Sequence, residues 1–262
     1  MKIATYNVWY PNIDVRAEQL ISEINSTDAD IIALQEVPQA FYKNLIKNTE
    51  FPYHGCVFYM DDDAELGLAF LSKYSFSEQF SLFESVEFDN SVAYNVIFEA
   101  NRIQYSITNV HLPWDSVLAK EKQIVAIDRY IHSQRDKAHF FILLGDFNCT
   151  LESSVHHYLL GDRTLSGFEA KPYWNDLAGV HAALNGYNVV PTLDFVNNPR
   201  WRGTNTNYVP DVCDRIYIME SFNWDHAFKL RGVSVFGKEV SPQTGYAPSD
   251  HYGLLAEVDF AV

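Results

Sequence analysis

Polar side chains that can bind a metal or move a proton follow apolar, strand-like segments at four places in the sequence. They are Asn7, Glu36, Asp146 with Asn148, and Asp250 with His251. Each alone has an ordinary explanation, because Asn, Asp and Gly favour turns and Ser, Asp or Asn can cap a helix. Together they place oxygen and imidazole groups at strand ends, where the loops of α/β proteins converge and ligands bind.

The chemistry that this set favours is metal-assisted attack of water at phosphorus. Carboxylate and amide oxygens suit a hard cation such as Mg²⁺, and no zinc-like spacing of His and Cys competes with them. The pair His156-His157 is disfavoured as a metal site, because adjacent helical residues do not share a face. His251, next to Asp250, can change its charge near neutral pH. A cation, a histidine and spare carboxylates are what phosphoester hydrolysis needs.

Length and composition are those of an ordinary globular protein. The chain has 262 residues, of which 47% are hydrophobic and 20% charged, and its net charge at pH 7 is −15. We expect residues 1–262 to form a single catalytic domain. The acidic balance disfavours long duplex DNA or RNA, whose binding relies on Lys and Arg, although carboxylates around a metal would themselves add negative charge.

The cysteines and the start of the chain bear on location. Cys56, Cys149 and Cys213 match neither a zinc pattern nor a disulfide framework, and we expect small core residues in a reducing compartment. The sequence begins with a strand-like segment instead of a signal peptide. No apolar run approaches the ~20 residues of a membrane helix. These features predict a cytoplasmic protein.

Short apolar segments that end in polar residues predict the strands that must position these groups: 3–8, 30–35, 67–72, 105–110, 140–144, 215–219 and 253–258. Segment 140–144 is apolar throughout, which predicts a central strand covered on both faces. Helical spacing of apolar residues occurs around 17–24 and again around 124–131. The order predicts two sheets packed face to face, with helices outside.

Segment 185–211 differs from the rest because it has several Pro and Asn residues and no clean period. A long irregular segment in a compact domain is usually functional or disordered. Within it, Arg200 and Arg202 can bind phosphate and Trp201 can stack on a base, although a buried Trp that anchors a surface loop is the alternative. We expect this segment to form one wall of the site, with Arg200, Trp201 or Arg202 facing the scissile group.

Five ordered motifs resemble those of the endonuclease/exonuclease/phosphatase superfamily. They are Thr5-Tyr6-Asn7-Val8, Leu34-Gln35-Glu36-Val37, Val110-His111-Leu112, Gly145-Asp146-Phe147-Asn148 and Ser249-Asp250-His251. Any one is weak, but five in order along the whole chain are highly specific. The resemblance implies a DNase I-like, four-layer α/β sandwich. In it two packed, mostly antiparallel sheets are flanked by helices, and the site lies at one edge of both.

The resemblance also implies a metal and a nucleophile. Glu36 would be the main ligand of Mg²⁺, for which Mn²⁺ can substitute, helped by Asn7 and by Asp250. Asp146 and Asn148 would hold and activate the attacking water. The activity implied is that of a metal-dependent phosphoric ester hydrolase.

Further roles concern the phosphate and the substrate. His251 would donate to a phosphate oxygen, His111 would contact the phosphate from the other side, and Asp214 would orient His251. Asp194 is a candidate for substrate binding, with a turn residue as the alternative. Trp114 either lines the mouth of the site or packs.

Within the superfamily, the closer likeness is to the tyrosyl-DNA phosphodiesterases. It rests on 248–255, on Cys213-Asp214-Arg215-Ile216-Tyr217 and on Thr192-Leu193-Asp194, whereas Thr150 stands where those enzymes have an Arg expected to contact phosphate. The implied substrate is a single-stranded DNA end or a protein–DNA adduct, in DNA repair. The alternatives are an abasic-site endonuclease, a sphingomyelinase-like enzyme, an inositol phosphatase, or a binding module without catalysis. No partner protein is evident.

Overall fold

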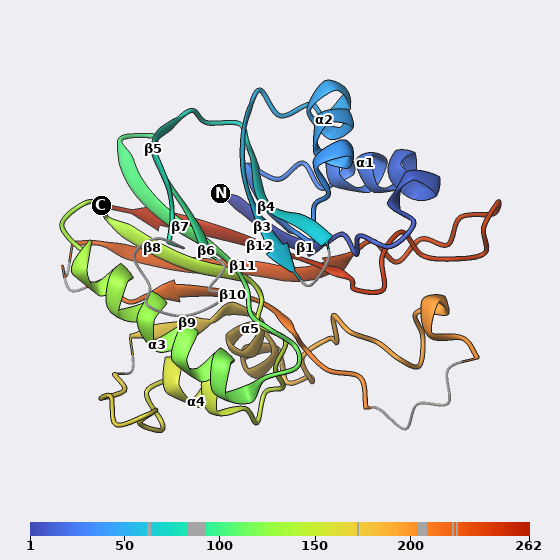
Figure 1. Cartoon of the computed structure of the whole chain (residues 1–262). Coiled ribbons are helices and arrows are strands. Elements are labelled where there is room, and N and C mark those ends of the chain that lie inside the picture. Colours follow the sequence, from blue (N-terminus) through green and yellow to red (C-terminus); the bar gives the residue numbers. More distant parts are fainter. Residues whose placement is uncertain (62–63, 83–92, 172, 204–208, 222, 224) are drawn as a thin grey trace.

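The computed structural model describes residues 1–61, 64–82, 93–171, 173–203, 209–221, 223 and 225–262. In these residues two six-stranded sheets pack face to face (Figure 1). In spatial order, the first sheet consists of β11 (Ala227–Phe236), β12 (Gly253–Ala261), β1 (Lys2–Asn7), β2 (Ile31–Gln35), β4 (Ala64–Ser72) and β3 (Tyr53–Asp61). The second consists of β5 (Phe76–Ser81), β6 (Ala93–Ala100), β7 (Ile103–His111), β8 (Phe140–Asp146), β10 (Asp214–Met219) and β9 (Trp174–Asp176).

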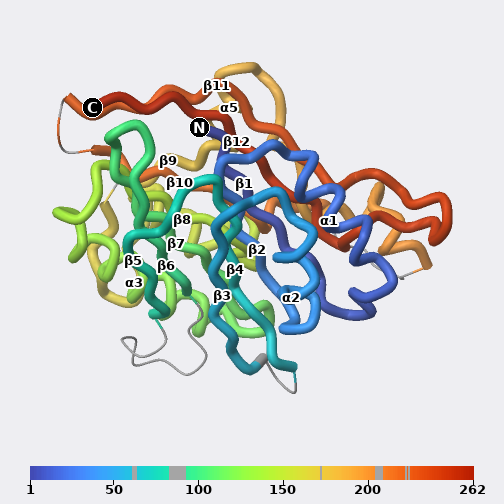
Figure 2. Tube along the Cα trace, turned by 90° about the horizontal axis from the view of Figure 1, so that it is seen from above, coloured from blue at the N-terminus to red at the C-terminus, as the bar shows by residue number. Residues whose placement is uncertain are grey.

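Helices cover the two outer faces, so the described residues form a four-layer α/β sandwich, as predicted (Figures 1 and 2). α1 (Ala17–Ser26) and α2 (Gln39–Asn48) pack on the first sheet. α3 (Val117–Ser133) and α4 (Ser154–Leu159) pack on the second. α5 (Leu177–Asn185) adds its first residues to the core between the sheets. None of the helices in the described ranges has the length and apolar character needed to cross a membrane.

Alternating side chains explain why the strands are covered on both faces. In β8, Phe140, Ile142 and Leu144 point into the core between the sheets. Phe141 and Leu143 point the other way, into the core beneath α3 and α4. All five are buried, because side chains along a strand alternate between its faces and each face meets an apolar layer. The prediction of a central strand over 140–144 is therefore confirmed.

All seven predicted strands and both predicted helices are present, with ends that differ by a few residues. The sequence patterns did not identify β3, β5, β6, β9 and β11, nor the helices α2 and α5. In the segment 185–211, α5 ends at Asn185, and the short 3₁₀-helix η2 (Pro199–Trp201) and a bridge between Leu193 and Asp211 follow. The predicted irregularity is confirmed for its described residues; residues 204–208 lie outside them.

Strand direction in the first sheet brings its polar residues to one end of the sandwich. β1 and β2 are parallel, with Asn7 opposite Gln35, so Glu36 follows immediately beside Asn7. β12 runs antiparallel to β1. Asp250 and His251 precede β12, and they therefore lie at the end of the sandwich where β1 finishes.

The second sheet converges on the same end. β7 and β8 are parallel, and His111 pairs with Asp146 at their last positions. β10 is antiparallel to β8, and its first residue, Asp214, lies opposite Asp146. The parallel pairs β1–β2 and β7–β8 end at this end of the sandwich, and the antiparallel strands β12 and β10 begin there. Groups that are distant in the sequence therefore meet.

Candidate active site

The core between the sheets becomes polar as it approaches this end. Gln35 Nε2 donates to Asn109 Oδ1 at 2.7 Å and to Thr5 Oγ1 at 3.0 Å. Asn109 Nδ2 donates to the carbonyl oxygens of Leu34 and Ala69 at 3.0 and 3.2 Å. All three side chains are buried, so these bonds offset the cost of removing polar groups from water. This layer forms a rigid floor, and the sequence motifs did not single out Asn109 or a role for Gln35.

Asn7 joins carboxylates that belong to different sheets. Its Nδ2 donates to Glu36 Oε1 and to Asp146 Oδ2, both at 2.9 Å. The Asn7 Oδ1 accepts from the backbone N–H of Trp9 at 2.9 Å, and Glu36 Oε2 accepts from that of Tyr10 at 3.2 Å. Glu36 has a left-handed backbone with φ 56°, a conformation that costs energy for a non-glycine residue and is frequent at functional sites.

A glycine allows Asp146 to approach β7. Gly145 has φ 136°, and a Cβ there would lie 2.0 Å from the carbonyl oxygen of Val110, so only glycine fits. After the turn, the backbone N–H of Asn148 donates to Asp146 Oδ1 at 2.8 Å. The Asn148 side chain donates to the carbonyl oxygen of Leu112 at 2.9 Å. The turn therefore fixes one oxygen of the Asp146 carboxylate, and Asn7 fixes the other.

His111 closes one side of the site and has a partner that the sequence did not reveal. Its Nε2 lies 3.7 Å from Glu36 Oε1 and 3.8 Å from Asp146 Oδ2. Its Nδ1 lies 2.8 Å from the hydroxyl of Tyr59. A ring nitrogen that faces two carboxylates carries a hydrogen, so in neutral His111 the Tyr59 hydroxyl donates to Nδ1. Recognition of β3 as a strand would have placed Tyr59 and Val57 on the face toward the second sheet.

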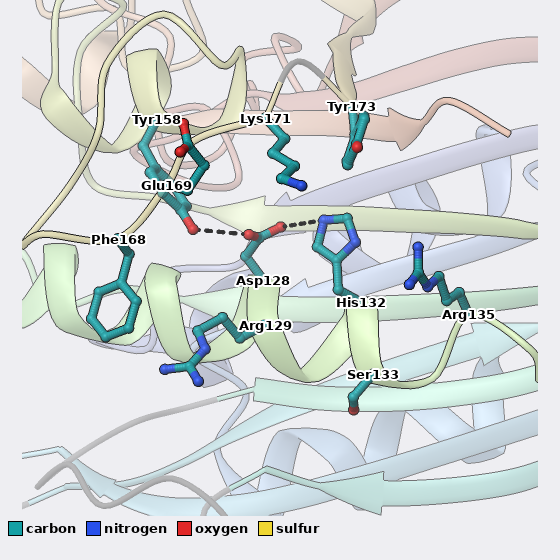
Figure 3. Close-up of a pocket in the computed structure, with 10 residues that line it drawn as sticks. All are labelled: Asp128, Arg129, His132, Ser133, Arg135, Tyr158, Phe168, Glu169, Lys171 and Tyr173. Carbon is teal, nitrogen blue, oxygen red and sulfur yellow. Dashed lines mark hydrogen bonds and ion pairs between the residues drawn. The ribbon is translucent and has the colours of Figure 1, made fainter. Parts of the chain in front are cut away.

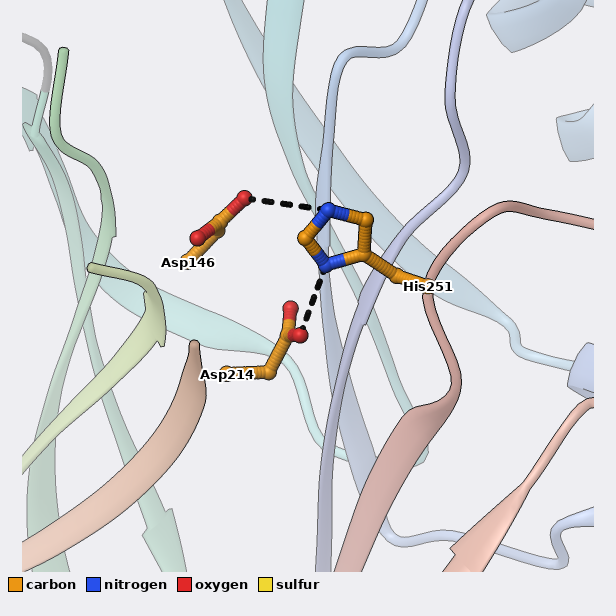
Figure 4. Close-up of side chains that lie close together, drawn as sticks. All are labelled: Asp146, Asp214 and His251. Atoms are coloured by element: carbon orange, nitrogen blue, oxygen red, sulfur yellow. Dashed lines mark hydrogen bonds and ion pairs between the residues drawn. The ribbon is translucent and has the colours of Figure 1, made fainter. Parts of the chain in front are cut away.

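His251 also approaches Asp146 and is held between two aspartates (Figure 4). Its Nδ1 is 2.8 Å from Asp214 Oδ2, and its Nε2 is 3.8 Å from Asp146 Oδ2. Burial lowers the pKa of His251, but the charges of Asp214 and Asp146 outweigh it and raise the pKa well above its usual value. The two aspartates therefore favour the imidazolium form of His251. Burial raises the pKa of Asp146, yet His251 and His111 bring the net shift downward, so this carboxylate stays ionised.

Asp250 completes an acidic group whose donors fit a hard cation. Burial raises the pKa of its carboxyl to about 6; the His251 charge opposes this shift, and the charges of Glu36 and Asp146 add to it. Carboxylates gathered in this way repel one another, and a divalent cation would offset that repulsion. Glu36, Asn7 and Asp250 offer the oxygen donors that Mg²⁺ prefers.

A second grouping of ligand atoms is also close enough to hold a metal ion, but only with His251 deprotonated. Atoms of Asp146, Asp214 and His251 lie within 4.8 Å of one another. A protonated His251 that donates from Nδ1 to Asp214 has no lone pair for a cation. We therefore expect a cation on the Glu36 side of the site, with Asp214 orienting the imidazole.

Two residues of the predicted recognition triplet hold the backbone that carries Asp250. Arg200 Nε donates to the carbonyl oxygen of Ala247 at 2.8 Å, and its guanidinium lies over the rings of Trp9 and Tyr246, each at 5.1 Å. Trp201 Nε1 donates to the carbonyl oxygen of Asp250 at 3.3 Å. The segment thus borders the site, as predicted. Arg202 is exposed, and contact of the triplet with a scissile group stays a prediction.

The remaining substrate candidates differ in placement. Asp194 is buried, and its Oδ1 accepts from the backbone N–H groups of Val196 and Asn197 at 3.1 and 2.9 Å, which is the turn role weighed as the alternative. Trp114 follows His111 by three positions and is 75% exposed, so its indole is accessible to solvent. Thr150 is exposed as well.

Comparisons with known proteins agree with the motifs. The model of the Endonuclease/Exonuclease/phosphatase family matches residues 4–251. The probable CCR4-Not complex 3′-5′-exoribonuclease subunit Ccr4 of Vairimorpha ceranae is 26% identical over 287 residues, which cover 95% of this chain. The chain spans 59% of the length of that relative.

Solved structures share the fold. TDP2 (tyrosyl-DNA phosphodiesterase 2) of D. rerio, complexed with single-strand DNA product, has a TM-score of 0.77 and 18% identity, covering 99% of this chain and 98% of that one. The mannosyl-6-phosphatase of Bacteroides thetaiotaomicron has a TM-score of 0.73 and 18% identity, covering 99% and 100%. The family match therefore confirms the resemblance recognised in the sequence. At 18% identity, the likeness to these solved structures shows a shared fold alone.

Proposed function

Because the chain belongs to the Endonuclease/Exonuclease/phosphatase family, whose members are metal-dependent phosphoesterases and nucleases, we propose that it hydrolyses a phosphodiester by attack of water. The observation that carries this proposal is the meeting of Glu36, Asn7, Asp146, His111 and the His251–Asp214 pair at one end of the sandwich. These groups come from both sheets, and no purely structural need explains so many polar groups gathered there.

The residues divide the reaction between them. Asp146, ionised and fixed by Asn7 and Asn148, accepts a proton from the attacking water. His251, held protonated by Asp214, donates from Nε2 to a phosphate oxygen as negative charge develops. His111 presents its Nε2 hydrogen from the opposite side.

We propose that Glu36 is the main ligand of a Mg²⁺ ion and that Asn7 and Asp250 are additional ligands. When bound, the cation supplies Lewis-acid stabilisation of charge on the phosphate. Mn²⁺ also prefers oxygen ligands and is expected to substitute.

The proposed substrate is a single-stranded nucleic-acid end or an adduct on it. A net charge of −15 disfavours long duplex, whereas exposed Trp114 and Arg202 offer a stacking surface and a phosphate contact. Two of the three similar proteins support this class, since one is named an exoribonuclease subunit and another is complexed with single-strand DNA product, whereas the third is a mannosyl-6-phosphatase. Thr150 cannot make the ionic phosphate contact that Arg makes in the tyrosyl-DNA enzymes, so we expect a broader choice of leaving group.

The proposal extends to context. We propose that residues 1–262 act as one catalytic domain and that the protein works in the cytoplasm, in repair of nucleic-acid ends. The free cysteines Cys56, Cys149 and Cys213 support a reducing compartment.

A substrate panel with Mg²⁺ tests the proposal. It includes 5′-tyrosyl single-stranded DNA, single-stranded RNA, abasic duplex, sphingomyelin, inositol polyphosphate and mannose 6-phosphate. We expect the two single-stranded substrates to have the highest kcat/KM, and we expect Glu36→Gln and His251→Gln to remove that activity. Higher turnover of abasic duplex, lipid or sugar phosphate would reject the substrate class. Inactivity on every substrate with metal bound would reject catalysis.

A further inference from the structure

We propose that a cavity beside the second half of α3, separate from the active site, binds a nucleotide. The cavity has a volume of about 460 Å³ and lies between α3 and the residues that precede β9 (Figure 3). This volume is within the ~300–1,000 Å³ of small-molecule sites. The proposal stands independently of the catalytic function.

The cavity is distant from the catalytic groups. At the first turn of α3, Lys120 Nζ donates to the carbonyl oxygen of Asn148, which marks the end of the helix near the active site. His132, in the cavity, follows Lys120 by twelve positions, a rise of about 18 Å along a helix. One phosphate group cannot contact both places, so the cavity is a second site and not an extension of the first.

A buried carboxylate gives the cavity a fixed polar floor. Asp128 accepts from the Tyr158 hydroxyl at 3.0 Å and from Trp174 Nε1 at 2.8 Å. His132 Nε2 lies 3.4 Å from Asp128 Oδ1, the oxygen that also accepts from Trp174 (Figure 3). These contacts satisfy the charge of Asp128 within the protein and turn the His132 ring so that its Nδ1 faces away from Asp128. The floor is therefore built before any ligand arrives.

Cations and aromatic rings contact each other in the lining of the cavity. The Arg129 guanidinium lies 4.8 Å from the Phe168 ring, and Lys171 Nζ lies 6.0 Å from that of Tyr173. The His132 ring lies 5.4 Å from the Tyr173 ring. Cation–π contacts hold flexible side chains near the cavity and lower the entropy lost when they bind an anion.

The charge of the cavity contrasts with that of the chain. Arg129, Arg135 and Lys171 line it, whereas the acidic lining consists of Asp128, already satisfied, and exposed Glu169. The whole chain has 19 Lys and Arg against 34 Asp and Glu. Cations at the rim suit a phosphate, and the rings of Phe168 and Tyr173 suit a planar base. A nucleotide carries both groups, and a sugar phosphate lacks the base.

Calorimetric titration with thymidine 5′-monophosphate tests the proposal. Metal is removed with EDTA so that the probe is not hydrolysed. We expect binding to the wild type and at least ~10-fold weaker binding to the double variant Arg129→Ala/Lys171→Ala, because two charge-assisted contacts are lost. The control Lys122→Ala/Lys47→Ala removes the same charge from exposed positions outside the cavity and should bind within ~2-fold of wild type.

Two further probes separate base from phosphate. We expect thymidine and inorganic phosphate each to bind at least ~10-fold more weakly than the nucleotide, because each lacks one of the two contacts. Equal affinity for inorganic phosphate and the nucleotide would mean that the rings of Phe168 and Tyr173 do not bind the base, and would overturn the nucleotide proposal. Unchanged nucleotide binding by Arg129→Ala/Lys171→Ala, or equal losses in the control, would overturn the site. Neither result would affect catalysis at Glu36.

Discussion

The hydroxyl of Tyr59 lies 2.8 Å from Nδ1 of His111, and the opposite nitrogen of the ring faces the carboxylates of Glu36 and Asp146. Tyr59 belongs to β3 of the first sheet and His111 to β7 of the second, so the contact crosses the sandwich. A hydroxyl donor on Nδ1 leaves the ring hydrogen on Nε2, where a phosphate would lie. Tyr59 is therefore expected to set the tautomer of His111.

Tyr59→Phe tests this role. Loss of one hydrogen bond of about 1 kcal/mol should lower kcat by roughly 3- to 10-fold. The ¹⁵N shifts of His111 should show mixed tautomers in the variant and the Nε2–H form in the wild type. Tyr53→Phe, an exposed position on the same strand, is the control and should change neither quantity. A variant with full kcat and one tautomer would reject the role.

Asp214→Asn tests the support of His251. The imidazolium loses its ionic partner at 2.8 Å, so we expect kcat to fall by about 10²- to 10⁴-fold with a small change in KM. The double variant with His251→Gln should lose no more than the worse single variant, because both residues act in one step. Multiplicative losses would mean that Asp214 acts apart from His251.

Glu36→Gln is expected to abolish measurable Mg²⁺ binding in a calorimetric titration while the fold persists. The amide removes the charge that a hard cation needs, and Glu36 lies at the edge of the core, partly open to solvent. Glu18→Gln, at an exposed position on α1, controls for the loss of one charge. If Glu36→Gln binds Mg²⁺ with the affinity of the wild type, other residues must be the ligands of the metal.

Most of the strands that the sequence patterns did not predict lie at the edges of the sheets. β3, β5, β9 and β11 form the edges of the two sheets as described; β3, β5 and β11 are only partly covered, and β9 has three residues. Exposure weakens the apolar signal that identified β8 or β2, whose described side chains are all buried. β6 is the exception, because it lies inside its sheet and was still missed.

The residues of the site likewise divide into those that the sequence patterns identified and those that they missed. The meeting of Glu36, Asp146 and His251 at one end of the sandwich was predictable, because each follows or precedes a strongly apolar strand within a family motif. Tyr59 was not, since it comes from an edge strand and matches no motif. Nor could the sequence show that Asp194 bonds the backbone of its own turn, because that contact depends on local geometry.

His156 is expected to make stability depend on pH. It is buried beside Tyr217, and burial, with the charge of Arg215, lowers its pKa to about 3. The unfolded chain binds a proton at His156 more readily than the folded protein does. The stability that comes from burying neutral His156 is therefore complete above ~pH 6.5 and is lost as pH falls toward 3. Between pH 6.5 and 5, the wild type should lose about 1–2 kcal/mol more unfolding free energy than His156→Gln. Urea titrations at the two pH values measure this, and parallel losses would contradict it.

The last prediction separates two roles within segment 185–211. Trp201 donates to the backbone of Asp250 and packs 4.7 Å from the Phe195 ring, so Trp201→Ala should disturb the metal side of the site whatever the substrate. We expect kcat/KM to fall about 10-fold on both an oligonucleotide and a small phosphodiester, which corresponds to the loss of roughly 1–1.5 kcal/mol. Arg202 is exposed, and Arg202→Ala should raise KM for the oligonucleotide alone, because contact with a remote phosphate is equal in ground and transition states.

Michaelis curves for both variants on both substrates decide between the roles. A loss confined to the oligonucleotide in Trp201→Ala would instead make this indole a stacking surface, worth about 1–3 kcal/mol per base. Trp201→Phe sharpens the distinction, because it keeps a smaller aromatic face and removes the Nε1 hydrogen bond to Asp250. Stacking predicts that Phe restores oligonucleotide binding, whereas support of the Asp250 backbone predicts that both substrates stay impaired.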